Sequence, residues 1–196
     1  MPTARLETFS DGVFAIAATL LILNVEVSHH GSLGHDLVHI WPAYAAYAVS
    51  FLVIGVIWVN HHTVLHLVDR ADRAFLFVNV VFLLAVAFLP FPTRVVADNL
   101  RGGDARAATV FYGLNSIAMS IGFLAVWLYA SRGGRLLAAD ADPRLVSGIT
   151  RSFLPGVPLY TVATLSCLIS PWLGAALYTA LALFYVASST VFARSE

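Results

Sequence analysis

The sequence predicts an all-α integral membrane protein, and both its composition and its long apolar segments indicate this class. Of the 196 residues, 59% are hydrophobic and 11% are charged, and the mean hydropathy is +0.82. Soluble domains carry about 25% charged residues, because their surfaces must be solvated by water. Lipid is therefore the expected surroundings for most of the chain. Eleven basic residues balance eleven acidic ones without a basic stripe, which argues against nucleic acid as a partner.

Six segments are long and apolar enough to cross a bilayer, which takes about 20 mostly apolar residues in a helix. We expect residues 1–196 to form a single six-helix transmembrane domain. Glu7 and Asp11 interrupt the apolar N-terminal segment, so we expect a retained first helix and not a cleaved signal peptide. The predicted spans cover residues 5–27, 41–66, 74–96, 107–131, 151–170 and 172–192.

Arginine positions predict the orientation of these spans. One side of the membrane receives eight arginines and the other receives three. Because cytoplasmic loops carry the excess of basic residues, both termini are predicted to be cytoplasmic. The arginines of the cytoplasmic side are Arg5, Arg70, Arg73, Arg132, Arg135, Arg144, Arg151 and Arg194, and those of the opposite side are Arg94, Arg101 and Arg106.

The first span has a mostly apolar stripe on one side and acidic residues on the opposite side. An acidic residue inside a membrane helix is costly unless it is paired, so Asp11 should face protein. The second span offers His61 at a similar depth, and we expect a hydrogen bond or ion pair between the two side chains. At about 100° per residue, the stripe comprises Arg5, Phe9, Gly12, Ile16, Thr19, Leu20 and Leu23.

Two interpretations stay open for each of these features. The Asp11/His61 pair can be a proton- or ligand-sensitive switch, because histidine titrates near neutral pH. It can also be a buried polar clamp that orients two helices, which is the more common role of such networks. The stripe can line a pore, or it can be the packing or lipid-facing side that apolar helix faces commonly form.

Three segments carry a family resemblance. The start of the first span resembles the signature of the endosomal and lysosomal potassium channel family (transmembrane protein 175) and of its prokaryotic homologues. Two later segments resemble that family in the same order, so the correspondence covers about the first half of the chain. The matching segments read Arg5-x-x-x-Phe9-Ser10-Asp11 with its continuation Gly-Val-Phe-Ala-Ile-Ala-Ala-Thr-Leu-Leu, then Trp58…His61-His62, then Leu89-Pro90-Phe91-Pro92-Thr93.

The resemblance implies a potassium-permeable channel of the cell membrane and not an enzyme. It implies a homotetramer in which the first helix of each subunit lines a central pore. The Thr-Val-Gly-Tyr-Gly carbonyl filter of other potassium channels is absent from the sequence. By resemblance, Ile16 forms a hydrophobic constriction, Leu20 and Leu23 form later apolar layers, and Thr19 is the polar position. Gly12 lies on the same stripe. The expected structural or gating network comprises Arg5, Phe9, Ser10, Asp11, Trp58, His61 and His62.

Other functions have weaker support in the sequence. The alternative function is a proton-coupled secondary transporter that uses Asp11 and His61 as a relay. Such transporters usually show internal repeats and broken helices, and neither is evident. The histidine pairs His62/His66 and His35/His39 have helical spacing for a metal, but neither has a third ligand close by. We therefore expect no resident metal and no cofactor, with potassium passing only transiently through the pore.

Overall fold

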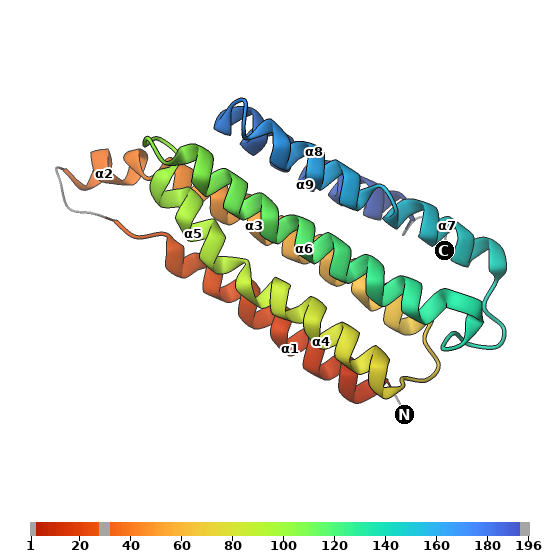
Figure 1. The fold of residues 1–196 in the computed structure, drawn as a ribbon. Coiled ribbons are helices and arrows are strands. Elements are labelled where there is room, and N and C mark those ends of the chain that lie inside the picture. The colour runs from red at the N-terminus through yellow and green to blue at the C-terminus, as the bar shows by residue number, and fades with distance from the viewer. Residues whose placement is uncertain (1–2, 28–31, 193–196) are drawn as a thin grey trace.

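The computed structural model describes residues 3–27 and 32–192, with side chains described to residue 188. Helices dominate this part of the chain, and they run up and down as a bundle (Figure 1). This confirms the predicted all-α class. The elements are α1 (Ala4–Leu20), the 3₁₀ turn η1 (Leu21–Asn24), α2 (Leu33–His39), α3 (Trp41–His66), α4 (Arg73–Phe88), α5 (Pro90–Asn99), α6 (Ala105–Ser131), the 3₁₀ turn η2 (Arg132–Gly134), α7 (Pro143–Phe153), α8 (Gly156–Ser166) and α9 (Pro171–Phe192).

Five helical stretches of the described residues are long and apolar enough to cross a membrane. They correspond to five of the six predicted spans, so the membrane-protein prediction holds for these segments. Their bounds are Ala4–Asn24, Trp41–His66, Arg73–Asn99, Ala105–Gly134 and Pro171–Ser188.

The remaining predicted span, residues 151–170, is not one continuous helix, and that expectation was wrong. The helix breaks between Phe153 and Gly156, which separates α7 from α8. Pro155 causes the break, because proline has no N–H for the carbonyl four residues earlier and its ring clashes with that carbonyl. Pro158 removes a second N–H one turn later. Both prolines are visible in the sequence, but the prediction of a single span rested on the apolar length of the segment.

A second proline bend joins α4 to α5 without ending the span. Pro90 begins α5, and Leu89 shifts its own hydrogen bond to the carbonyl of Val86, at 3.1 Å. The carbonyl of Ala85 then accepts a 3.2 Å hydrogen bond from Nδ2 of Asn115 on α6. A neighbouring helix thus satisfies the backbone group that the bend frees, as membrane helices require.

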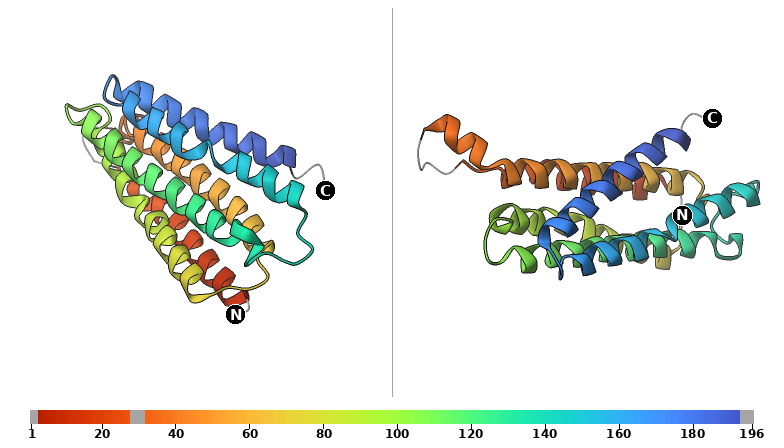
Figure 2. Two further views of the ribbon diagram at one scale, coloured as in Figure 1. Left: turned by 45° about the vertical axis from the view of Figure 1, so that its right-hand side comes forward. Right: turned by 90° about the horizontal axis from the view of Figure 1, so that it is seen from above.

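The helical stretches α1, α3, α4–α5, α6, α7–α8 and α9 alternate in direction, so the start of α1 and the end of α9 lie at the same end of the bundle (Figure 1). The connection from α3 to α4 and the start of α7 lie at that end too. The opposite end carries α2 and the turns from α5 to α6 and from α8 to α9. Two further views place α1 and α8 on different sides of the central pair α3 and α6 (Figure 2). Arg194, which entered the orientation count, lies outside the described residues.

Asp72 ties two connections together at the end of the bundle where α1 begins. Its carboxylate caps α4 by accepting a 2.8 Å hydrogen bond from the N–H of Phe75. The same carboxylate accepts hydrogen bonds from the hydroxyl of Tyr129, at 3.1 Å, and from Arg135, at 2.9 Å. The Phe75 N–H, followed by Tyr129 and Arg135, holds the pKa of Asp72 below its ordinary range.

Candidate functional site

Helix α1 divides into a face that packs against its own subunit and a face that does not. Leu6, Phe14 and Ala17 are buried against the bundle. On the other face, Ile16 is 61% exposed and Leu20 is 42% exposed. Burial of one face therefore leaves the predicted stripe on the outside of the single subunit.

Within this outward face, the polar and small residues have distinct surroundings. Thr19 is exposed, and its hydroxyl donates to the carbonyls of Ala15 and Ile16, at 3.0 Å each. The hydroxyl hydrogen is thus engaged by the helix backbone, while the oxygen keeps its lone pairs for another partner. Around Gly12, a Cβ atom would meet nothing within 4 Å in the subunit. Both positions are open to whatever covers α1.

Leu23 departs from the geometry that the helical wheel assumes. It lies in η1, because the α-helix ends at Leu20 and continues as a 3₁₀ turn. A 3₁₀ turn advances about 120° per residue, in place of about 100° in an α-helix. Leu23 remains on the surface, with 62% of its area exposed. Its direction relative to Ile16 therefore differs from the uniform stripe that the sequence predicted.

Asp11 bonds to Trp58 and not to His61. The indole Nε1 of Trp58 donates a 2.8 Å hydrogen bond to Oδ1 of Asp11. The expected Asp11–His61 hydrogen bond was wrong, since His61 turns into the core and is 1% exposed whereas Asp11 is exposed. Residues three apart on α3 differ in direction by only about 60°, so the two side chains are neighbours on the helix, and the packing of α3 leaves Trp58 at the surface while His61 points into the core.

His61 belongs to a buried chain of hydrogen bonds that joins three helices. Its Nε2 lies 2.7 Å from Oδ1 of Asn79 on α4, and Nδ2 of Asn79 donates to Oγ of Ser10 on α1 at 3.1 Å. Asn79 and Ser10 are fully buried. The network predicted from the sequence did not include Asn79; a lone amide within an apolar span was the available signal.

The other predicted network residues lie at the margin of this arrangement. Arg5 and Phe9 are exposed, and within the described part of the chain Arg5 makes no hydrogen bond or ion pair. The ring of His62 stacks on Trp58, with centroids 6.2 Å apart, and meets His66 edge-on at 4.5 Å. Among residues 3–27 and 32–192, no three His, Cys, Asp or Glu side chains are grouped to hold a metal ion.

The fold and this helix define a class: a multi-pass α-helical membrane protein whose first helix leaves an apolar face exposed in the single subunit. The profile of the family described as "Endosomal/lysosomal potassium channel TMEM175" matches residues 5–90. A potassium channel of Chamaesiphon minutus is 41% identical over 192 residues, covering 95% of each chain. A potassium channel of Streptomyces collinus is 43% identical over 187 residues, covering 93% of this chain and 91% of that protein.

A solved structure agrees with these relatives. The crystal structure of a lysosomal potassium-selective channel TMEM175 homologue from Chamaesiphon minutus superposes with a TM-score of 0.87, at 38% identity, and covers 95% of this chain and 97% of that one. The chain therefore belongs to the TMEM175 family, as a homologue of its prokaryotic members. This confirms the resemblance seen in the first spans and extends it over nearly the whole chain. The family is one of channels, in agreement with the expectation that the protein is not an enzyme.

Proposed function

We propose that the chain is one subunit of a potassium-permeable channel in the cell membrane. The observation that carries the proposal is the outward face of α1, where Ile16, Leu20 and Thr19 stay exposed while the opposite face packs into the subunit. The bacterial relatives, 41% and 43% identical over nearly the full chain, are potassium channels by name. A self-association that covers this face is the arrangement that a channel of one chain type requires.

In the proposed assembly, four copies place α1 around a common axis. The side chain of Ile16 is 61% exposed in the subunit, and four such side chains form an apolar ring. A narrow apolar ring blocks ions by excluding water until it widens, and this dewetting acts as the gate. Leu20 and Leu23 form the next layers. The Thr19 oxygen, whose hydrogen is held by the backbone, offers lone pairs to a partly dehydrated cation.

The polar network sets how α1 is rotated in this proposal. Asp11 is held by Trp58 of α3, and the adjacent Ser10 is held by Asn79 of α4. Neighbouring residues of an α-helix point about 100° apart, so two such attachments oppose rotation about the helix axis. Rotation would carry Ile16 away from the pore axis. The network is thus a structural support of the constriction and a place where gating can act.

The proposed topology has six crossings with both termini in the cytoplasm. Helices α7 and α8 together form the fifth crossing, with the break at Pro155 inside the membrane region. The arginine count of eight against three supports the cytoplasmic assignment for the end where α1 begins. The common position of the start of α1 and the end of α9 supports an even number of crossings (Figure 1).

Ion flux from liposomes that contain the purified full chain tests this function. Potassium flux that needs no coupling ion, measured beside sodium and proton fluxes, is the expected result. Potassium flux strictly coupled to a proton gradient would instead support the transporter. Absence of flux from folded, inserted protein, both in the wild type and in Ile16→Asn, would overturn the channel.

A further inference from the structure

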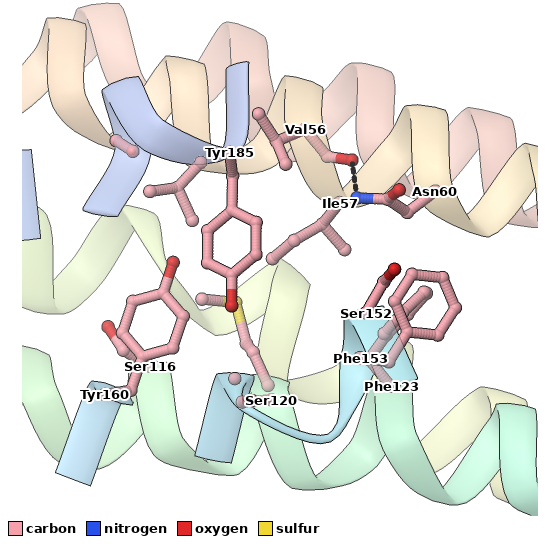
Figure 3. Close-up of a pocket in the computed structure, with 14 residues that line it drawn as sticks. Val56, Ile57, Asn60, Ser116, Ser120, Phe123, Ser152, Phe153, Tyr160 and Tyr185 are labelled. Carbon is pink, nitrogen blue, oxygen red and sulfur yellow. Dashed lines mark hydrogen bonds between the residues drawn. The ribbon is translucent and has the colours of Figure 1, made fainter. Parts of the chain in front are cut away.

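A cavity lies inside the subunit where α7 breaks from α8, and none of its lining residues belongs to α1. It lies between α3, α6, α7, α8 and α9 and is partly open to the surroundings (Figure 3). The cavity is separate from the proposed pore face.

Three hydroxyl groups at this cavity lack partners. Within the described part of the chain, no hydrogen bond reaches Oη of Tyr160, Oη of Tyr185 or Oγ of Ser120. Among the described residues, every buried side-chain nitrogen or oxygen has a hydrogen-bond partner. The three unpartnered hydroxyls are therefore not fully buried. Figure 3 shows Tyr185 reaching from α9 across the cavity towards α6, with Tyr160 beside it on α8.

Gly156 keeps the space between two of these hydroxyls open. A Cβ atom at Gly156 would lie 2.9 Å from Oγ of Ser120 and 3.6 Å from Oη of Tyr185. Gly156 is buried at the start of α8, directly after the break. The missing side chain therefore leaves room where the two hydroxyls converge.

The other polar lining groups are already engaged or partly engaged. Ser116 donates to the carbonyl of Tyr112 at 3.0 Å, and Ser152 donates to the carbonyl of Gly148 at 3.1 Å. Nδ2 of Asn60 donates to the carbonyl of Val56 at 3.0 Å, which leaves the amide oxygen as an acceptor (Figure 3). The cavity thus presents hydroxyls that can donate or accept and one amide acceptor.

The chemistry of the walls defines what fits. No lining side chain is charged, and the rest of the wall is mainly apolar, with Ile57, Met119 and Phe123 among its members. Unpaired hydroxyl groups at membrane depth cost free energy, since no bulk water reaches them there. An occupant must therefore be uncharged, with an apolar body and at least one hydrogen-bonding group.

We propose that this cavity binds a neutral amphiphile whose hydroxyl group bonds with Tyr185 and Ser120 and whose apolar body lies against α3 and α6. A hydroxyl both donates and accepts, so it satisfies the unpartnered groups better than an ether or a hydrocarbon does. The same chemistry occurs in hydroxyl-bearing membrane lipids and in small dissolved phenols or alcohols.

Binding of 4-butylphenol to the full chain in lipid nanodiscs tests the proposal, with 4-butylanisole as the matched probe that cannot donate. A ligand of the folded state raises the unfolding temperature in a concentration-dependent way. We expect the phenol to bind wild type about tenfold more tightly than the anisole, as for one hydrogen bond at a desolvated site. Ser120→Leu, which fills the cavity, should abolish binding of both probes, while Val162→Leu on the exposed side of α8 should not.

A second variant keeps the test decisive if Ser120→Leu does not fold. Tyr160→Phe/Tyr185→Phe adds no volume and removes two hydroxyls, so the preference for phenol over anisole should fall to within about twofold. An equal affinity for the two probes in wild type, or unchanged phenol binding in the double variant, would overturn the proposal. So would a cavity that holds water alone and takes up neither probe.

Analysis of molecules retained by protein purified from its membrane distinguishes the two sources. A hydroxyl-bearing lipid retained by wild type and lost from Ser120→Leu identifies a membrane lipid as the occupant. Phenol binding without any retained lipid identifies a small dissolved amphiphile. If the protein retains no lipid and also does not bind the phenol, the site itself is contradicted. All of these readouts are independent of potassium flux, so the site and the channel function stand or fall separately.

Discussion

The indole Nε1 of Trp58 lies 2.8 Å from Oδ1 of Asp11, so α3 holds α1 by a residue on its exposed side. One residue earlier, Ser10 is held from the buried side by Asn79 of α4. These two attachments point in different directions around the axis of α1, since successive residues differ by about 100°. They define how far the outward face of α1 can turn, and that face carries Ile16.

Removing the Trp58 donor should destabilise the subunit moderately. Trp58→Phe keeps an aromatic ring but loses the hydrogen bond to Asp11, and we expect a loss of about 0.5–2 kcal/mol in the free energy of unfolding. Trp172→Phe is the matched control, because Trp172 is similarly exposed and stacks on Trp41. Thermal unfolding in nanodiscs measures both. An equally large shift in the control would show that the Trp58 effect is not due to its hydrogen bond.

Replacing Asn79 should cost more than replacing Asn115. Asn79→Leu leaves both His61 and Ser10 without their partner, whereas Asn115→Leu removes a single bond to the carbonyl of Ala85. Unsatisfied buried polar groups cost about 1–3 kcal/mol each, so we expect the larger loss of unfolding free energy for Asn79→Leu. A double-mutant cycle with His61→Phe should give a coupling of about 1 kcal/mol. If the losses of unfolding free energy in the two single variants summed to the loss in the double variant, a direct His61–Asn79 interaction would be ruled out.

Asp72 should make the protein sensitive to acid. The Phe75 N–H, Tyr129 and Arg135 lower the pKa of Asp72 in the folded state, so its contribution to stability is complete above the ordinary aspartate range. That contribution is lost as the pH falls through the lowered pKa. Asp72→Asn keeps a helix-capping side chain but cannot ionise, and its stability should lack this acid-dependent part.

Urea or thermal unfolding between neutral and strongly acidic pH checks the Asp72 prediction. Asp140→Asn is the control, since Asp140 is exposed and its side chain makes no hydrogen bond or ion pair among the described residues. The control should keep the acid-dependent loss of wild type. If Asp72→Asn lost as much stability in acid as the wild type does, groups other than Asp72 would be responsible for that loss.

Gly122 permits a close approach between α4 and α6. A Cβ atom at this position would lie 3.2 Å from Cα and Cβ of Phe82, and backbone atoms cannot move aside as easily as a flexible side chain can. Gly122→Ala should therefore lower the unfolding free energy by about 1–3 kcal/mol. Gly55→Ala meets nothing within 4 Å and should be neutral or stabilise by up to about 1 kcal/mol. A neutral Gly122→Ala would contradict tight packing there.

Five spans and the outward placement of Ile16 could be predicted because long apolar segments and helical periodicity are local properties. The break at Pro155 was present in the sequence, but apolar length alone does not say whether a proline bends a span or divides it. Pro90 bends its span without dividing it, because Asn115 satisfies the carbonyl freed at Ala85.

The partner of Asp11 could not be predicted, because it depends on how α3 is rotated against α1. His61 and Trp58 lie within one turn of each other, and only packing decides which of them meets Asp11. Asn79 joins the network only because α4, a third helix, brings it within hydrogen-bonding distance of both His61 and Ser10. That placement is a tertiary property. The cavity at the α7–α8 break likewise arises because α3 and α6, which are distant in sequence, pack against the consecutive helices α7, α8 and α9.

Currents through Ile16→Asn channels test the central claim, that α1 lines the pore with Ile16 as its constriction. Asparagine would hydrate the ring, so we expect a higher single-channel conductance or a weaker preference for potassium over sodium. Ile121→Asn on α6 is the matched control, because Ile121 is a similarly exposed isoleucine in a spanning helix outside the proposed pore. Unchanged conductance and selectivity in Ile16→Asn, in channels shown to fold and insert, would contradict the account.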